Sequence, residues 1–109
     1  MKVEIFYFKK GSRFRFGFAD APKTMKDFMK DYVKVWSKDL VGLGLEDGIL
    51  DGLFSKFNLG NNPLSTPENQ EMLRNKNVRH TSMSVGDVIK LGNVYYYCDN
   101  EGWERIELK

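Results

Sequence analysis

Residues 80–91, HTSMSVGDVIKL, form the stretch around which the rest of this chain is organised. A hydroxyl-rich polar segment leads into a corner at Val85, Gly86 and Asp87, and an apolar strand over residues 88–91 leaves it. Glycine permits a positive φ at such a corner, and an aspartate can accept hydrogen bonds from nearby backbone amides. We therefore expect Val85, Gly86 and Asp87 to be structural residues that turn the chain into the strand.

The segments on either side of this stretch predict strands at both ends of the chain. Residues 94–98 and 103–108 follow it after turns at 92–93 and at 99–102, where Gly102 lies, which predicts a three-stranded meander. Residues 2–9 and 13–19 are rich in β-branched and aromatic side chains and are separated by a Lys-Gly-Ser turn. They predict an N-terminal β-hairpin.

The middle of the chain predicts helices. Apolar residues recur at helical spacing over residues 25–36, which predicts an amphipathic helix with a lysine-rich outer face. Residues 45–58 predict a second helix, weakened by two glycines. A third is expected over 67–75, where a hydroxyl residue precedes Pro67.

These elements predict one α+β domain over residues 1–109. It would comprise the hairpin (1–19), a helical part (24–76) and a β tail (77–109). We expect a single antiparallel sheet of about five strands in mixed order, with the helices on one face.

Composition narrows the possible chemistry. The chain has one cysteine, Cys98, so no internal disulfide can form and a reducing compartment is expected. With one histidine and one cysteine there is no plausible zinc or iron site, and no glycine-rich phosphate loop is present. We expect no metal and no cofactor. No apolar run approaches the roughly 18 residues that cross a bilayer, so we expect a soluble cytoplasmic protein.

The polar run before the corner is the first candidate site. It holds more hydroxyl groups than a corner needs, beside an imidazole and a guanidinium, and such groups can bind a phosphate or face a partner. The candidate partner-binding residues are Arg79, His80, Thr81, Ser82 and Ser84, with Trp103 nearby. His80 with Ser82 or Ser84 also has the residue types of a hydrolase or transferase, but triads are usually assembled from separate elements. We therefore expect no catalytic residue and no enzymatic activity.

The N-terminal hairpin is the second candidate site. Residues 1–38 carry ten Lys/Arg against four Asp/Glu, whereas the remaining residues carry seven against eleven. Such a split can indicate an anionic partner, although solvated or mutually attracting halves are the preferred explanation. Lys9, Lys10, Arg13 and Arg15 are the candidate nucleic-acid contacts. Alternation puts the arginines and the neighbouring phenylalanines on opposite faces, which weakens this alternative.

Residues 79–89, the run YYYCD at 95–99 and the pair Gly102-Trp103 resemble the YodL-like group of short phage and mobile-element proteins. The similarity covers about 30 residues, with Trp103 where that group commonly has phenylalanine. It implies a phage or mobile-element accessory protein in the host cell cytoplasm, with a host protein as its partner, and it brings no catalytic residues. Together with the motif, it favours a protein that binds and inhibits or redirects a host component, for example in anti-defence. Nucleic-acid binding and hydrolase or transferase activity remain the alternatives.

Overall fold

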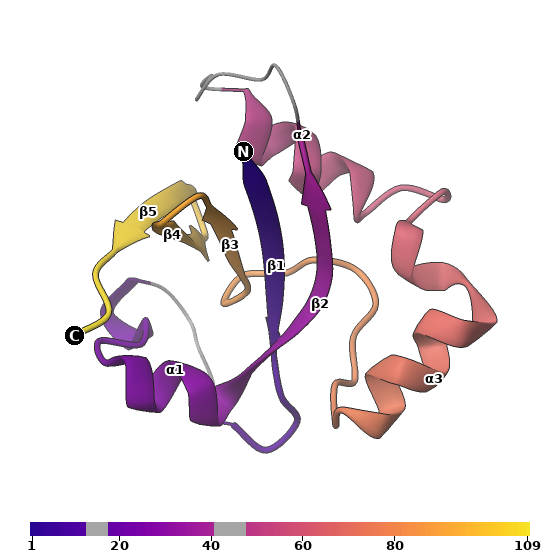
Figure 1. The fold of residues 1–109 in the computed structure, drawn as a ribbon, viewed down its shortest axis with the longest axis horizontal. Helices are drawn as coiled ribbons and strands as arrows, with labels where there is room; N and C mark the ends of the chain where they lie inside the picture. The colour runs from indigo at the N-terminus through magenta and orange to yellow at the C-terminus, as the bar shows by residue number, and fades with distance from the viewer. Residues whose placement is uncertain (13–17, 41–47) are drawn as a thin grey trace.

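A five-stranded antiparallel sheet in the order β2-β1-β3-β4-β5 forms the centre of the computed structural model (Figure 1). The structure describes residues 1–12, 18–40 and 48–109. The strands are β1 (Lys2–Phe8), β2 (Tyr32–Asp39), β3 (Val88–Leu91), β4 (Val94–Asp99) and β5 (Gly102–Ile106). The helices are α1 (Met25–Asp31), α2 (Ile49–Lys56) and α3 (Pro67–Asn75), with 3-10 turns η1 (Phe18–Asp20) and η2 (Pro63–Ser65). The predicted α+β class is confirmed.

The C-terminal half follows the sequence-based prediction closely. β3, β4 and β5 form the expected meander, and β3 continues the sheet by pairing with β1. Helix α3 occupies the predicted residues, and the Thr66 side chain caps it by accepting a hydrogen bond from the Asn69 amide at 3.2 Å. Two strong local signals account for this agreement. One is the two-residue turn between β3 and β4, and the other is the start of α3, where a hydroxyl residue precedes a proline.

The helix predicted over residues 25–36 was wrong in its second half. Helix α1 ends at Asp31, and Tyr32 begins β2, which pairs antiparallel with β1. Tyr, Val and Trp favour strands. In β2, however, Trp36 pairs with Ile5 and Lys34 pairs with Phe6, so Val35 is an extra residue without a partner position in β1. This bulge interrupts the alternation of apolar and polar residues along the strand. The resulting spacing of apolar residues imitates a helix.

The N-terminal antiparallel pair therefore has a different second strand from the one expected. β1 is paired on one edge with β2 and on the other with β3. Of the strand predicted over residues 13–19, residues 13–17 lie outside the described part of the chain, and Phe18 and Ala19 belong to η1. The long connection between these two strands includes η1 and α1.

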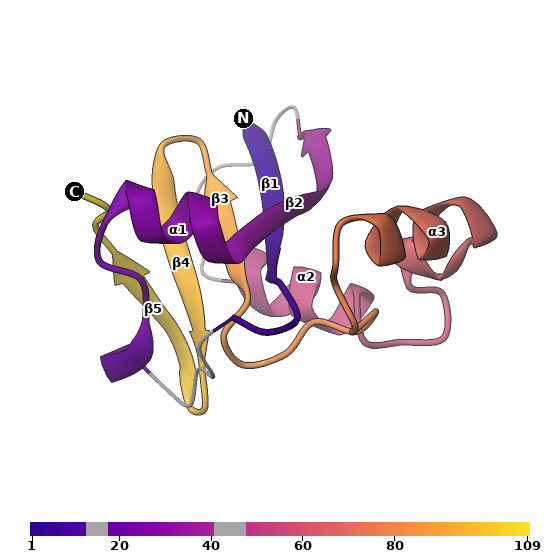
Figure 2. The same cartoon turned by 90° about the horizontal axis from the view of Figure 1, so that it is seen from below.

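Helices lie on both faces of the sheet, which corrects the expectation of one covered face (Figure 2). On one face, Ile5 and Ile89 pack against residues of α2 and α3 such as Leu53 and Leu73. The other face packs against Phe28 of α1, which contacts the rings of Phe6, Tyr32 and Tyr95. Successive residues of a strand point to opposite faces, and β1 and β3 carry apolar side chains on both faces of the sheet. Each face must therefore be buried under a helix of its own.

Phe28 provides a test of this second core. Its side chain is 2% exposed, whereas the next apolar residue of the same helix, Met29, is 67% exposed. We expect Phe28→Ala to lower the free energy of unfolding by about 3–5 kcal/mol, and Met29→Ala to change it by less than about 0.5 kcal/mol. Denaturant unfolding followed by circular dichroism measures both. Equal effects of the two substitutions would contradict the placement of α1 on the sheet.

Candidate functional site

Residues 79–87 carry the chain from α3 to β3 as an irregular segment (Figure 1). The corner at its end has the geometry that the sequence predicted: Gly86 has a φ of 100°, in the left-handed region that favours glycine. The Asp87 amide donates to the Ser84 carbonyl at 3.0 Å, and the Gly86 amide donates to the Cys98 carbonyl of β4 at 2.9 Å. The corner is therefore fixed to the sheet by its own backbone.

Asp87 is the fully buried charged residue of this segment, with 0% of its surface exposed. Its carboxylate accepts hydrogen bonds from the amides of Ser84 at 2.9 Å and Phe8 at 3.1 Å. The His80 imidazole lies 2.9 and 3.0 Å from the two carboxylate oxygens through Nε2. Burial raises the pKa of the Asp87 carboxyl, and the bonds from His80, Ser84 and Phe8 offset part of that rise.

The His80 ring is held by aromatic side chains of β1. It stacks on Tyr7 with a centroid distance of 4.5 Å and on Phe8 with one of 4.3 Å. Stacking and the bond to Asp87 together fix the imidazole against the sheet. His80, singled out from the sequence as a partner contact, therefore also helps to hold the segment in place.

A second set of hydrogen bonds fixes the middle of the segment at Thr81. The Thr81 carbonyl accepts from the Tyr7 hydroxyl at 2.9 Å and from the side-chain amide of Asn62 at 3.0 Å. Gln70 of α3 donates to the Thr81 hydroxyl at 2.9 Å. Burial, and then the Asp87 charge, raise the pKa of Tyr7, so its hydroxyl remains a donor. Tyr7, Asn62 and Gln70 carried no sequence signal that pointed to Thr81, because they lie far from it along the chain.

The structure divides the candidate partner-binding residues into two groups. Arg79 and Ser82 are exposed, whereas His80, Thr81 and Ser84 are half-buried and engaged in the contacts above. Trp103 makes its described side-chain contacts with α2: its indole Nε1 donates to Asp51 at 3.2 Å, and its ring meets that of Phe54 edge-on.

The candidate nucleic-acid contacts are only partly described. Lys9 is half-buried and Lys10 exposed in the turn after β1, whereas Arg13 and Arg15 lie outside the described residues. The Lys9 amide donates to the Asp31 carbonyl at the end of α1, and the Lys10 amide donates to the Asn77 carbonyl beyond α3. This turn therefore lies where the ends of two helices meet.

The connections among the polar side chains decide what chemistry they can perform. In a nucleophile–base–acid triad the hydroxyl bonds the imidazole, which in turn bonds the carboxylate. Here the Ser84 hydroxyl lies 3.4 Å from the Asp87 carboxylate, and the His80 Nε2 atom is hydrogen-bonded to that same carboxylate. The hydroxyl and the imidazole thus share the acid, an arrangement that orders a loop.

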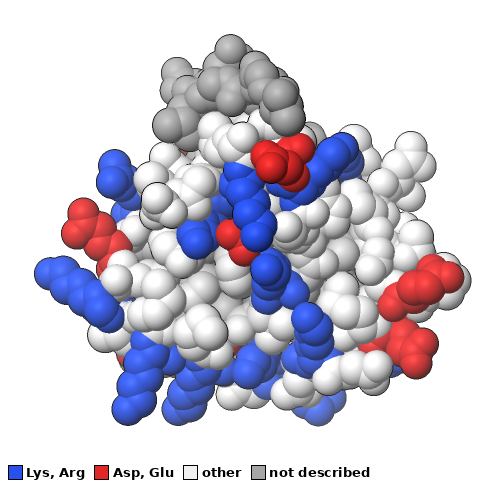
Figure 3. Space-filling view, viewed as in Figure 1, with Lys and Arg blue, Asp and Glu red and all other residues white. Residues whose placement is uncertain are grey.

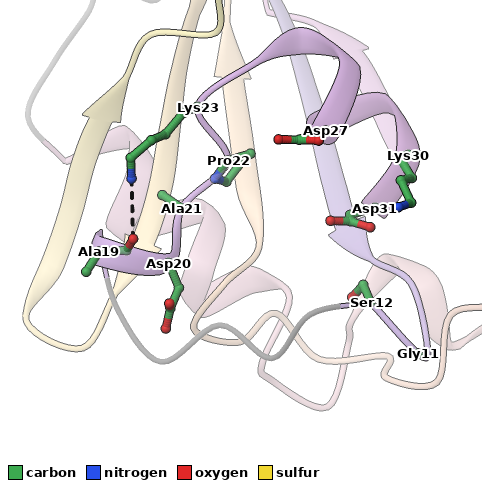
Figure 4. A pocket seen from close by; sticks show the side chains of 10 residues that line it. All are labelled: Gly11, Ser12, Ala19, Asp20, Ala21, Pro22, Lys23, Asp27, Lys30 and Asp31. Carbon is green, nitrogen blue, oxygen red and sulfur yellow. Dashed lines mark hydrogen bonds between the residues drawn. The ribbon is translucent and has the colours of Figure 1, made fainter.

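A separate hollow of about 380 Å³ lies between η1, α1 and the turn after β1 (Figure 4). Lys23, Asp27, Lys30 and Asp31 contribute side chains of both signs to its wall, and the Lys23 ammonium donates to the Ala19 carbonyl at 3.4 Å. None of the residues in the candidate partner-binding set lines it. Among the described residues, no group of three or more His, Cys, Asp or Glu side chains is placed to hold a metal ion. None of the described helices is long and apolar enough to cross a membrane.

Comparison with known proteins places the chain in a family. It is 38% identical over 107 residues to uncharacterized protein R785 of Acanthamoeba polyphaga mimivirus, and the alignment covers 97% of this chain and 93% of the viral protein. The chain therefore belongs to the same family as this mimivirus protein. No family model and no solved structure matches it. The similarity to the YodL-like group therefore rests on the sequence motif alone.

The buried carboxylate should dominate the stability of the segment. Asp87→Ala leaves the amides of Ser84 and Phe8 without their acceptor, and we expect it to lower the free energy of unfolding by about 3 kcal/mol or more. Asp39→Ala is the control, because Asp39 is 75% exposed and forms a surface ion pair with the N-terminus, so its loss should cost at most about 1 kcal/mol. Urea unfolding of both variants measures the difference, and similar losses would contradict the anchoring role.

Cys98 should be an unreactive thiol. Burial, and then the nearby charges of Asp87, Asp99 and Asp51, raise the pKa of Cys98 to about 12, so the thiol stays protonated at mildly alkaline pH. We expect the native protein to react with dithionitrobenzoate far more slowly than the protein unfolded in guanidinium chloride, as followed by absorbance. Equal rates would show that the thiol is accessible.

Proposed function

We propose that this chain is a non-catalytic viral accessory protein that binds a host protein and inhibits or redirects it. The observation that carries the proposal is the rigid anchoring of residues 79–84, which leaves the Arg79 and Ser82 side chains exposed. An irregular segment fixed by buried polar contacts is a suitable recognition surface, because binding orders little that is not already ordered.

The anchors lie on both sides of Ser82. The Thr81 carbonyl is bonded by Tyr7 and Asn62, and Met83, which follows Ser82, is 2% exposed in the main core. The Met83 amide also donates to the carbonyl of Phe57, the residue that follows α2, at 3.3 Å. Ser82 is therefore an exposed residue between two anchored neighbours, the half-buried Thr81 and the buried Met83. A guanidinium at Arg79 and a hydroxyl at Ser82 suit hydrogen-bonding and acidic groups of a protein partner.

A catalytic role is less well supported than binding. The His80 imidazole is stacked on two aromatic rings and bonded to Asp87, and the Ser84 hydroxyl is directed to the same acid. A general base must reach the proton that it removes, and both candidate groups are committed to the fold. These contacts support the proposal that the chain is not an enzyme.

The relative supports a viral setting for this function. The mimivirus protein is of nearly the same length as this chain, since the alignment covers 93% of it. The motif that resembles the YodL-like group includes the corner at Gly86 and Asp87 and the pair Gly102-Trp103. On that resemblance we propose a host-directed accessory role, which includes the possibility of acting against host defence.

The test compares captured partners of three purified proteins. We expect the wild-type chain, immobilised and incubated with an Acanthamoeba lysate, to retain a defined host protein that Arg79→Ala/Ser82→Ala fails to retain. The control variant Glu101→Ala/Glu104→Ala alters exposed residues of the β4–β5 region and should retain that protein. Affinity for the identified partner, measured with purified components, should fall roughly tenfold or more in the first variant.

Both variants change exposed side chains, so thermal unfolding is expected to match that of the wild type and serves as the folding check. An unchanged set of captured proteins with Arg79→Ala/Ser82→Ala would refute this surface. A reaction catalysed by the wild type and abolished in a folded His80 variant would refute the non-catalytic assignment.

A further inference from the structure

Three segments that are distant in the sequence meet at the end of β1 and bring basic side chains together. They are the turn after β1, the junction of α1 with β2, and the end of α3. Their cations form what we term the basic corner: Lys9, Lys10, Lys30, Lys34, Arg74 and Lys76. The sequence alone grouped Lys9 and Lys10 with Arg13 and Arg15, and gave no reason to add residues from α3.

Backbone hydrogen bonds fix this arrangement. The Lys9 amide donates to the Asp31 carbonyl at 2.8 Å, which joins the turn to the end of α1. The Lys10 amide donates to the Asn77 carbonyl at 2.7 Å, and the Asn77 side chain donates back to the Lys10 carbonyl at 3.3 Å. The Lys76 ammonium reaches the Lys34 carbonyl of β2 at 3.5 Å. The basic corner is thus a built feature of the fold.

Most of its charges face solvent. Lys10, Lys30, Lys34, Arg74 and Lys76 are exposed, and Lys9 is half-buried. Figure 3 shows Lys and Arg atoms gathered along the lower edge of the molecule, where Figure 1 places α1 and the turn after β1. Acidic groups reduce this charge only in part: Glu4 lies 3.3 Å from Lys34, and Asp27 and Asp31 share the wall of the hollow with Lys30. A local excess of positive charge follows, although the whole chain carries only +2.

The composition of the basic corner favours phosphates over a protein surface. Five of its six cations are lysines, which are depleted at the centres of protein interfaces but serve as point charges for phosphate groups. Among the described residues the large exposed apolar side chains are Met25, Met29 and Leu59, and none of these is the aromatic ring that base stacking uses. Contacts would then be made to the nucleic-acid backbone, which carries no sequence information.

We infer that the basic corner binds the phosphate backbone of nucleic acid without sequence preference. The residues of this site differ from the exposed Arg79 and Ser82 proposed to contact a host protein. It also differs from a stacking platform on an N-terminal hairpin, because it depends on cations contributed by α1, β2 and α3.

The experiment measures binding of a fluorescein-labelled duplex of about 20 base pairs by anisotropy, at salt concentrations from about 50 to about 300 mM. The corner variant is Lys10→Gln/Lys30→Gln/Lys76→Gln. The matched control, Lys2→Gln/Lys38→Gln/Arg105→Gln, removes the same charge from exposed positions at the far end of β1 and β2 and on β5. All six residues are exposed, and circular dichroism verifies that both variants fold.

We expect the wild type and the control variant to bind with similar affinity and salt dependence. The corner variant should bind roughly a hundredfold more weakly at about 0.1 M salt, and the slope of log K against log salt should fall by about 2.7 if three phosphate contacts are lost. Absence of binding by the wild type at the lowest salt would overturn the inference, as would equal losses in the two variants. Competition by polyglutamate at equal charge concentration, as effective as that by unlabelled duplex, would overturn it in favour of an acidic protein partner.

Discussion

The burial of one carboxylate, Asp87, is the constraint on which the arrangement of this protein depends. A carboxylate with no exposed surface is tolerated only where its oxygens accept hydrogen bonds. Here the donors are Phe8 at the end of β1, His80 and Ser84. The backbone carbonyl of Asp87 also accepts from the Cys98 amide of β4 at 2.9 Å. One residue therefore joins the first strand, the irregular segment and the C-terminal meander, and any displacement of these parts would leave a buried charge unsatisfied.

The end of β1 is the junction that transmits this constraint to the rest of the fold. Three successive amides, those of Phe8, Lys9 and Lys10, donate to the Asp87 carboxylate, the Asp31 carbonyl and the Asn77 carbonyl, respectively. Each bond reaches a different element: the corner before β3, the end of α1 and the end of α3. This junction therefore holds both candidate sets of exposed residues in place. The exposed side chains of Arg79 and Ser82 lie on the anchored segment, and the basic corner surrounds the turn.

Local signals predicted the parts of the fold in which neighbours in sequence decide the conformation. The start of α3 at Pro67, the meander with its turn at Gly92, and the corner at Gly86 were all correct, because a cap or a glycine at positive φ acts within a few residues. The extent of the first helix was wrong because Val35 interrupts the pairing of β2 with β1, so strand residues recur at helical spacing. The side on which the helices lie was also wrong, since both faces of β1 are apolar and residue type alone does not say which helix covers which face.

The sequence by itself determined the α+β class, the C-terminal meander and the structural corner at Val85, Gly86 and Asp87, because these follow from short-range preferences of the backbone and from alternation. It also identified the polar segment before that corner as the place to look for a site. Only the tertiary structure decided which of its side chains remain available: Tyr7, Asn62 and Gln70 bind Thr81, and His80 binds Asp87, while Arg79 and Ser82 stay exposed. The basic corner likewise exists only in three dimensions. Its cations are spread from residue 9 to residue 76 of the sequence, and long-range hydrogen bonds bring them together.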